Sequence, residues 1–181
     1  RTALLVFLAL ATPLLGQTAP PAEPGPFRET ELVELTSLDP TIRLDVKYAT
    51  SDNFVGRPVY REARAFLQRP AAEALVRAHR KLAEKGWGLM VFDGYRPWAV
   101  TKAFWDATPD DKKVFVADPR RGSRHNRGAS VDVTLFDRAT GKASDLGGAY
   151  DEFGARSYVT WEGGTKEQLE RREALRGAME R

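Results

Sequence analysis

The chain lacks cysteine altogether, and its 181 residues include only two histidines and two methionines. The absence of thiols excludes disulfides, thiolate metal sites and a cysteine nucleophile. The formal net charge is +3, and lysine and arginine form no cluster interleaved with aromatic residues, which argues against nucleic acid as a partner. No apolar run reaches the roughly 20 residues that a membrane-spanning helix needs, so we expect no stable membrane insertion.

The N-terminal region begins with an arginine, continues with a mostly apolar run at 3–15 and then turns to small residues. This order is typical of a secretory signal peptide, here over residues 1–16. The alternative is a helix packed on the domain, which Pro13 disfavours. Residues 17–27 are rich in proline and predict an extended tether, which leaves one domain over residues 28–181. We therefore expect an exported protein of the periplasm or cell envelope.

Hydrophobic periodicity predicts a mixture of short strands and helices. Residues 129–135 alternate strictly between apolar and polar, as a half-buried strand does, and residues 88–92 form a short apolar run that suits a buried strand. Residues 70–85 begin with proline and stop before Gly86, which predicts a helix. The other expected elements are strands at 32–35 and 42–48 and helices at 97–108 and 165–181. The predicted fold class is α+β, an antiparallel sheet with helices packed on its apolar face.

One histidine and one aspartate stand where a loop enters the strand at 129–135. His125 lies in the loop, Asp132 lies on the polar face of the strand, and Gly128 lets the chain bend between them. Imidazole and carboxylate are both good zinc ligands, and a catalytic zinc usually has three protein ligands and a water. The alternative is an ordinary loop histidine beside the solvated face of an edge strand. The other histidine, His79, falls on a predicted helix, where we expect a packing residue rather than a ligand.

Arg96 belongs to the turn Asp-Gly-Tyr-Arg-Pro at residues 93–97, between a predicted buried strand and a predicted helix. Functional residues are often held on such loops by a rigid scaffold. A plain surface arginine on a turn is the alternative. The turn is therefore a candidate functional segment.

Three motifs resemble the D-alanyl-D-alanine dipeptidases, a family of zinc metallopeptidases. They are Ser-x-His-x-x-Gly-x-x-x-Asp at 123–132, Asn-Phe-x-Gly at 53–56, and the Asp-Gly-Tyr-Arg-Pro turn. The resemblance implies one zinc ion per chain, held by His125, Asp132 and a further histidine. It also implies that Arg96 stabilises the tetrahedral intermediate of peptide hydrolysis, because a fixed cation beside a developing oxyanion lowers the barrier.

The resemblance further implies two substrate-binding residues. Asp151 is the candidate for holding the free amino group of the substrate, since a desolvated ammonium needs a carboxylate partner. Its neighbour Glu152 is the rival for this role, and a solvated acidic pair is the alternative. Ser123 matches the substrate-contacting serine of the family, although it could equally satisfy the backbone of its own loop.

The chain departs from the family pattern near its end. In the family, a Glu-x-x-His segment after the last helix supplies the general acid/base and the third zinc ligand. No histidine follows His125, and neither Glu162 nor Glu167 has a histidine three residues on. We expect that the chain is truncated at both ends, since it also lacks an initiating methionine. The alternative is a degenerate, inactive protein.

The function implied is zinc-dependent hydrolysis of the dipeptide D-alanyl-D-alanine in peptidoglycan metabolism. One alternative is a D,D-carboxypeptidase that trims peptidoglycan stem peptides and needs an open cleft. The other is a non-catalytic cell-envelope binding module that kept the fold and lost the base. Inability to cut acylated or longer substrates would distinguish the dipeptidase from the carboxypeptidase.

Overall fold

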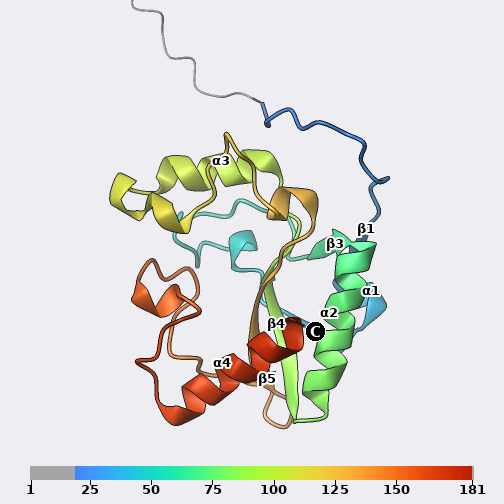
Figure 1. Ribbon diagram of the computed structural model, residues 1–181, viewed down its shortest axis with the longest axis vertical. Coiled ribbons are helices and arrows are strands. Elements are labelled where there is room, and N and C mark those ends of the chain that lie inside the picture. Colours follow the sequence, from blue (N-terminus) through green and yellow to red (C-terminus); the bar gives the residue numbers. More distant parts are fainter. Residues whose placement is uncertain (1–18, 181) are drawn as a thin grey trace, which may run out of the picture.

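The computed structural model describes residues 19–180, which form a mixed α+β fold of small sheets and helices (Figure 1). The predicted signal peptide at 1–16 lies outside the described residues. Residues 19–31 contain neither helix nor strand, and Glu23 within them forms an ion pair with Arg127. None of the described helices is long and apolar enough to cross a membrane.

The main sheet has three strands in the order β2-β4-β5. They are β2 (Arg43–Leu44), β4 (Trp87–Asp93) and β5 (Asp132–Asp137). The prediction of an antiparallel sheet is right for β4 and β5 and wrong for β2, which runs parallel to β4. The chain between β2 and β4 includes a long helix, and such a crossover is what a parallel pair needs.

The strand predicted at 42–48 is shorter than its pattern suggests. After β2 the chain turns into the 3-10 helix η1 (Lys47–Ala49), because the backbone N–H of Lys47 bonds back to the carbonyl of Asp45 at 2.8 Å. The turn carries the ring of Tyr48 into the interior, where it is 1% exposed. A second, two-stranded sheet joins β1 (Leu32–Glu34) to β3 (Phe66–Gln68), and the short helix α1 (Leu35–Leu38) follows β1.

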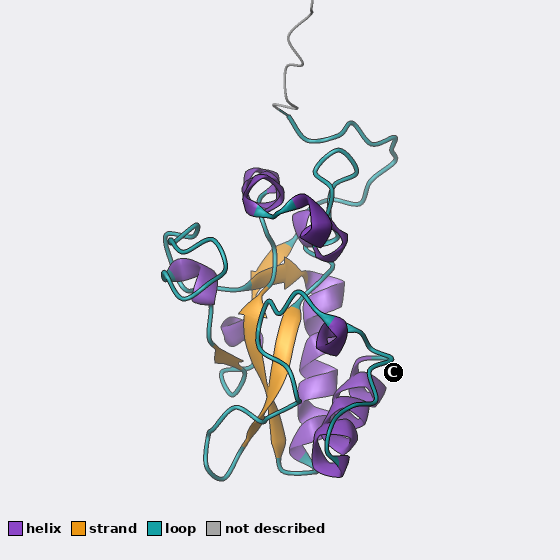
Figure 2. Cartoon of the chain, turned by 90° about the vertical axis from the view of Figure 1, so that its left-hand side faces the viewer, coloured by secondary structure: helices purple, strands orange, loops and turns teal. Residues whose placement is uncertain are grey.

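Two helices cover the same side of the main sheet, in agreement with the predicted arrangement (Figure 2). Helix α2 (Arg69–Ala83) begins with a proline in its first turn and packs on β4. Helix α4 (Lys166–Met179) begins at a capping box formed by Thr165 and packs on α2 and β5. The buried apolar side chains of this core include Leu35, Ile42, Leu67, Leu75, Leu82, Leu89, Val91 and Leu135.

His79 fastens α2 to the sheet. The backbone N–H of Leu89 donates to its Nδ1 at 3.0 Å, so this nitrogen carries no proton and Nε2 is the donor to Thr41 Oγ1 at 2.9 Å. Thr41 in turn donates to Asp39. Both ring nitrogens are used inside the core, and the prediction that His79 is a packing residue is confirmed.

Helix α3 (Trp98–Ala107) and two 3-10 helices lie beyond one end of β4 and β5 (Figure 1). Helix α3 follows the turn after β4, and the 3-10 helix η2 (Asp110–Phe115) follows α3. The 3-10 helix η3 (His125–Arg127) stands just before β5. Because β4 and β5 are antiparallel, the turn after β4 and the loop before β5 meet at the same end of the sheet.

Candidate metal centre and substrate cavity

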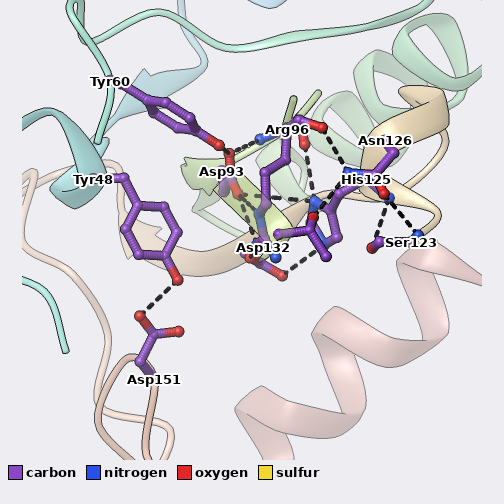
Figure 3. A network of polar contacts seen from close by, with 11 residues as sticks. Tyr48, Tyr60, Asp93, Arg96, Ser123, His125, Asn126, Asp132 and Asp151 are labelled. Atoms are coloured by element: carbon purple, nitrogen blue, oxygen red, sulfur yellow. Dashed lines mark hydrogen bonds and ion pairs between the residues drawn. The ribbon is translucent and has the colours of Figure 1, made fainter. Parts of the chain in front are cut away.

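The ends of β4 and β5 place two aspartates side by side. In the antiparallel register Met90 pairs with Thr134 and Val91 with Val133, but Asp93 pairs with Asp132. The skipped residue, Phe92, forms a β-bulge, which re-aims the side chains that follow it. Residues directly opposite each other share a face of the sheet, so both carboxylates point to the same side (Figure 3).

His125 is carried to the aspartates by a loop that is bonded to the Arg96 turn. The backbone N–H of Arg96 donates to the carbonyl of His125 at 3.0 Å. The side-chain amide of Asn126 donates to the carbonyl of Arg96 at 2.9 Å and to Thr101 Oγ1 at 2.8 Å. Gly128 ends η3 with a φ of 65°, where an added Cβ would lie 2.8 Å from Leu32. The glycine is therefore required both by the left-handed backbone and by close packing.

The hydrogen bonds of His125 determine which of its nitrogens can bind a metal. Its Nδ1 lies 2.9 Å from the carbonyl oxygen of Gly94, and a carbonyl only accepts, so Nδ1 carries the proton. The lone pair of Nε2 is then free, and it faces Asp132 Oδ1 at 3.4 Å. Tetrahedral zinc with bonds of about 2.0–2.1 Å holds its ligand atoms roughly 3.4 Å apart. His125 and Asp132 therefore fit two corners of a zinc site.

The charges around this pair favour an ionised carboxylate. Burial alone would raise the pKa of Asp132, but the His125 hydrogen bond and the Arg96 charge outweigh it and lower that pKa. Burial would likewise lower the pKa of His125, yet Asp132 beside it raises it in the metal-free protein. A metal cation would take the place of the proton that this pair otherwise attracts.

Asp93 is the third member of the only group of three or more potential metal ligands among the described residues. Its oxygens are already engaged, however. Oδ1 accepts from the Tyr60 hydroxyl and the Gly94 N–H, each at 2.8 Å, and Oδ2 accepts from Arg96 Nε at 2.7 Å. Asp93 thus holds Arg96 in place, and its bonding suits that role better than metal ligation. The sequence offered one sign of this role, an acid three residues before an arginine on a tight turn.

Arg96 is buried rather than exposed, which overturns the alternative of a plain surface arginine. Only 8% of it is exposed, and its guanidinium lies 4.8 Å from the ring centre of Phe104 and 5.6 Å from that of Tyr48. Burial opposes its charge, but Asp93 and Asp132 outweigh burial and raise the pKa of Arg96. Nη2 lies 3.2 Å from Asp132 Oδ2. A permanent cation therefore stands next to the candidate metal ligands.

These groups line a cavity of about 910 Å³, and Asp151 lines the same cavity. The Tyr48 hydroxyl donates to Asp151 Oδ2 at 2.8 Å (Figure 3). Burial raises the pKa of Asp151 to about 6, although the Tyr48 hydrogen bond works against it. Asp151 is also the one non-glycine residue with positive φ, 55°, in the described part of the chain. Tyr48 was given no role from the sequence, because its partner lies 103 positions away.

The rival of Asp151 is engaged in its own loop. Glu152 pairs with Arg156 at 2.6 Å and accepts from the backbone N–H of Ala149 at 3.1 Å. Among the described residues Asp151 forms no ion pair, and its one side-chain partner is the neutral hydroxyl of Tyr48, so its charge is the one available to a ligand ammonium. The substrate role of Asp151 remains a prediction, which this difference favours.

Ser123 lines the cavity and also serves its loop. Its Oγ accepts from the backbone N–H of His125 at 3.2 Å, and its own N–H donates to Asn126 Oδ1 at 2.8 Å. The loop-satisfying interpretation thus holds, while substrate contact by Ser123 remains a prediction.

A histidine–carboxylate pair spaced for a metal ion, beside a buried arginine in the same cavity, is typical of metal-dependent hydrolases. Residues 28–181 match the model of peptidase family M15, described as D-Ala-D-Ala dipeptidase. The chain belongs to this family of metallopeptidases.

Similar proteins carry the same description. The D-alanyl-D-alanine dipeptidase of Escherichia coli K12 is 36% identical over 130 residues, which cover 72% of this chain and 66% of the relative. That of Enterococcus faecalis V583 is 34% identical over 157 residues, 77% of this chain and 78% of the relative. That of Streptomyces coelicolor is 37% identical over 128 residues, 61% of this chain and 63% of the relative. The chain thus spans about two thirds to three quarters of the length of these relatives.

Proposed function

We propose that this chain forms the zinc-binding and substrate-binding part of an enzyme that hydrolyses D-alanyl-D-alanine in peptidoglycan metabolism. The observation that carries the proposal is the 3.4 Å separation of His125 Nε2 and Asp132 Oδ1, since it matches tetrahedral zinc with one lone pair aimed from each ligand. The dipeptide itself is suggested by the relatives, all of which are described as D-alanyl-D-alanine dipeptidases.

Each residue of the site has a distinct part in the proposed reaction. Zinc held by His125 and Asp132 would lower the pKa of a bound water and so supply the nucleophile. Arg96 stabilises negative charge on the carbonyl oxygen that is attacked, and Asp93 keeps the guanidinium in place before the charge develops. The carboxylate of Asp151 binds the ammonium of the substrate, which fixes the peptide bond relative to Arg96.

Two roles of the family pattern are not assigned to any residue here. In the family these are the general acid/base and the third zinc ligand of a Glu-x-x-His segment, and the sequence contains no Glu-x-x-His. For the same reason the decisive assay uses the complete gene product.

We also propose that the protein is exported, on the basis of the basic, apolar and small-residue order of residues 1–16. Fractionation of cells that express the complete gene product tests export separately from activity. Recovery of the protein in the cytoplasm with residues 1–16 intact would contradict it.

The function is tested by release of D-alanine from D-Ala-D-Ala, from N-acetyl-D-Ala-D-Ala and from a pentapeptide stem, each with and without a chelator. We expect chelator-sensitive cleavage of the free dipeptide only, because Asp151 provides a carboxylate for a free ammonium. Cleavage of the stem would favour the D,D-carboxypeptidase. Zinc-free protein that cleaves nothing would favour the binding module.

A further inference from the structure

The segment that carries Asp151 is a long loop without β-structure, residues 145–162, which we call the Asp151 loop. It leaves β5 after a short hairpin and ends before α4. Two residues of α4 contact its start: Gln168 Nε2 donates to Asp145 Oδ2 at 2.8 Å, and Arg171 Nη1 donates to the Asp145 carbonyl at 3.0 Å. Helix α4 therefore lies against this loop as well as against the core.

Arg172 contacts the Asp151 loop at three separate points. Its Nη1 donates to the carbonyls of Leu146 at 3.3 Å and Arg156 at 3.2 Å, and its Nη2 donates to the carbonyl of Tyr158 at 2.8 Å. The guanidinium also lies 5.2 Å from the ring centre of Trp161. One side chain thus joins the stretch before Asp151 to the stretch after it.

Close packing between Gly147 and Trp161 also holds the two ends of the Asp151 loop together. Gly147 has a φ of 85°, and a Cβ on it would lie 2.6 Å from the Trp161 ring. The two ends of the loop therefore meet at van der Waals distance next to Arg172. Asp151, with its positive φ of 55°, lies between these tied points, in a conformation that is uncommon for a residue other than glycine.

We propose that Arg172 is the positioning residue that holds the Asp151 carboxylate in the cavity lined by the candidate metal ligands, and that it thereby sets selectivity for peptides with a free amino terminus. This inference rests on the proposed function. Arg172 need not touch the substrate, since it acts through the carbonyls of Leu146 and Arg156 on either side of Asp151.

Arginine suits this position for a geometric reason. Three carbonyls are reached from the two Nη atoms of one planar group, and the guanidinium presents its donors in a fixed fork. A lysine would keep the charge but would offer one nitrogen in place of the fork, so it would hold fewer of the three carbonyls.

The kinetic test compares R172A, R172K and the control R176A in the complete gene product. Arg176 stands one turn further along α4, and its guanidinium pairs with Glu173 on the helix itself. Because ammonium binding acts in the ground state and in the transition state alike, its loss raises KM more than it lowers kcat. For D-Ala-D-Ala we expect KM to rise at least tenfold in R172A and about threefold in R172K, with kcat within about threefold and zinc content unchanged. R176A should match the wild type.

Limited proteolysis supplies a readout that does not depend on activity. Trypsin cuts after arginine, and the carbonyl of Arg156 is one that Arg172 holds. We expect cleavage after Arg156, identified by mass spectrometry, to be at least fivefold faster in R172A than in the wild type and unchanged in R176A.

The outcomes separate this inference from the proposed function. An unchanged KM in R172A, or equal rates of cleavage after Arg156, overturns the role of Arg172. If R172A does not fold, R172K decides: a raised KM with full zinc content supports the role, and an unchanged KM overturns it. A wild type that cleaves no dipeptide refutes the proposed function, while the tryptic comparison still tests whether Arg172 holds the loop.

Discussion

At the scale of single residues, the chemistry of the site depends on how a few buried charges are paired. The pKa of Asp132 is lowered and the pKa of Asp151 is raised, although both are carboxylates lining one cavity. Asp132 has an imidazole and a guanidinium beside it, whereas Asp151 has the neutral hydroxyl of Tyr48. The first is prepared for a metal cation, and the second carries a cost of ionisation that a ligand ammonium would remove.

The raised pKa of Asp151, about 6, predicts a pH dependence of substrate binding. Below that pKa the carboxyl is protonated and can no longer pair with an ammonium. We expect KM for the free dipeptide to rise about tenfold between pH 7 and pH 5, following the ionised fraction. Steady-state kinetics test this, with zinc content measured at each pH so that metal loss is recognised. D151N should show a high KM that no longer follows this ionisation.

The same shift makes Asp151 a burden on stability at neutral pH. Its folded pKa lies above the unfolded value, so the cost is absent below pH 4 and grows as the pH rises through about 6. D151N should therefore be more stable than the wild type at pH 7, on the order of 2 kcal/mol, and about equal to it at pH 4. Denaturant unfolding at both pH values measures the difference. A loss of stability in D151N at pH 7 would contradict the assignment of this cost.

Asp93 and Arg96 form a buried pair, and without Asp93 the guanidinium keeps only the longer contact to Asp132 at 3.2 Å. We expect D93N to lower the free energy of unfolding by about 3 kcal/mol and to reduce kcat, since Arg96 is no longer held. Y60F removes one neutral donor from the same carboxylate and should cost only about 1 kcal/mol. Equal losses of unfolding free energy in D93N and Y60F would show that the charge of Asp93 stabilises the fold no more than one neutral hydrogen bond does.

At the scale of elements, the sheet and α2 are joined through His79, whose bonds reach both β4 and the segment before β2. Burial lowers the pKa of His79 in the folded protein. Its contribution to stability is therefore complete above the unfolded pKa of about 6.5 and is lost as the pH falls below that value. H79Q should be less stable at pH 8 and should show a smaller loss between pH 7 and pH 5. Thermal unfolding across this range tests the difference in slope.

The sequence predicted most elements and the packing of helices on one face of the sheet, but not the parallel pairing of β2 or the bulge in β4. The helix predicted at 70–85 and the strand predicted at 88–92 are found as α2 and β4, because each buries one continuous apolar face. The two-residue strand β2 is too short for a period, so its parallel pairing was invisible in the sequence. The bulge at Phe92 was equally hidden, since it is a property of two strands rather than of one.

The candidate site was predictable only where its parts are close in the chain. His125 and Asp132 stand seven positions apart across one bend, and the structure brings them together as expected. The contact of Arg96 with Asp132 and that of Tyr48 with Asp151 join segments that only the complete topology places side by side. The residues that hold and orient the site were therefore the ones that sequence reasoning missed.

At the scale of the whole molecule, the candidate zinc ligands stand in η3 and β5, and their arrangement depends on the turn that carries Arg96 after β4, so metal binding depends on the complete fold. Zinc that binds only the folded state stabilises it, by about 2.7 kcal/mol at a hundredfold excess over Kd. For a domain of this size we expect chelation to lower Tm by about 5–10 °C. H125A should show no such shift. A chelator effect that persists in H125A would place the metal elsewhere.

The turn at Gly94 has a consequence for how this site can be explored. The oxygen that determines which nitrogen of His125 faces Asp132 belongs to a peptide group, so no side-chain replacement deletes it. An alanine scan would not detect this acceptor, and sequences that share none of the surrounding side chains could still keep the same carbonyl oxygen. A substitution at Gly94 can displace this oxygen only by moving the turn, because an added Cβ would lie 2.6 Å from the carbonyl oxygen of Phe66.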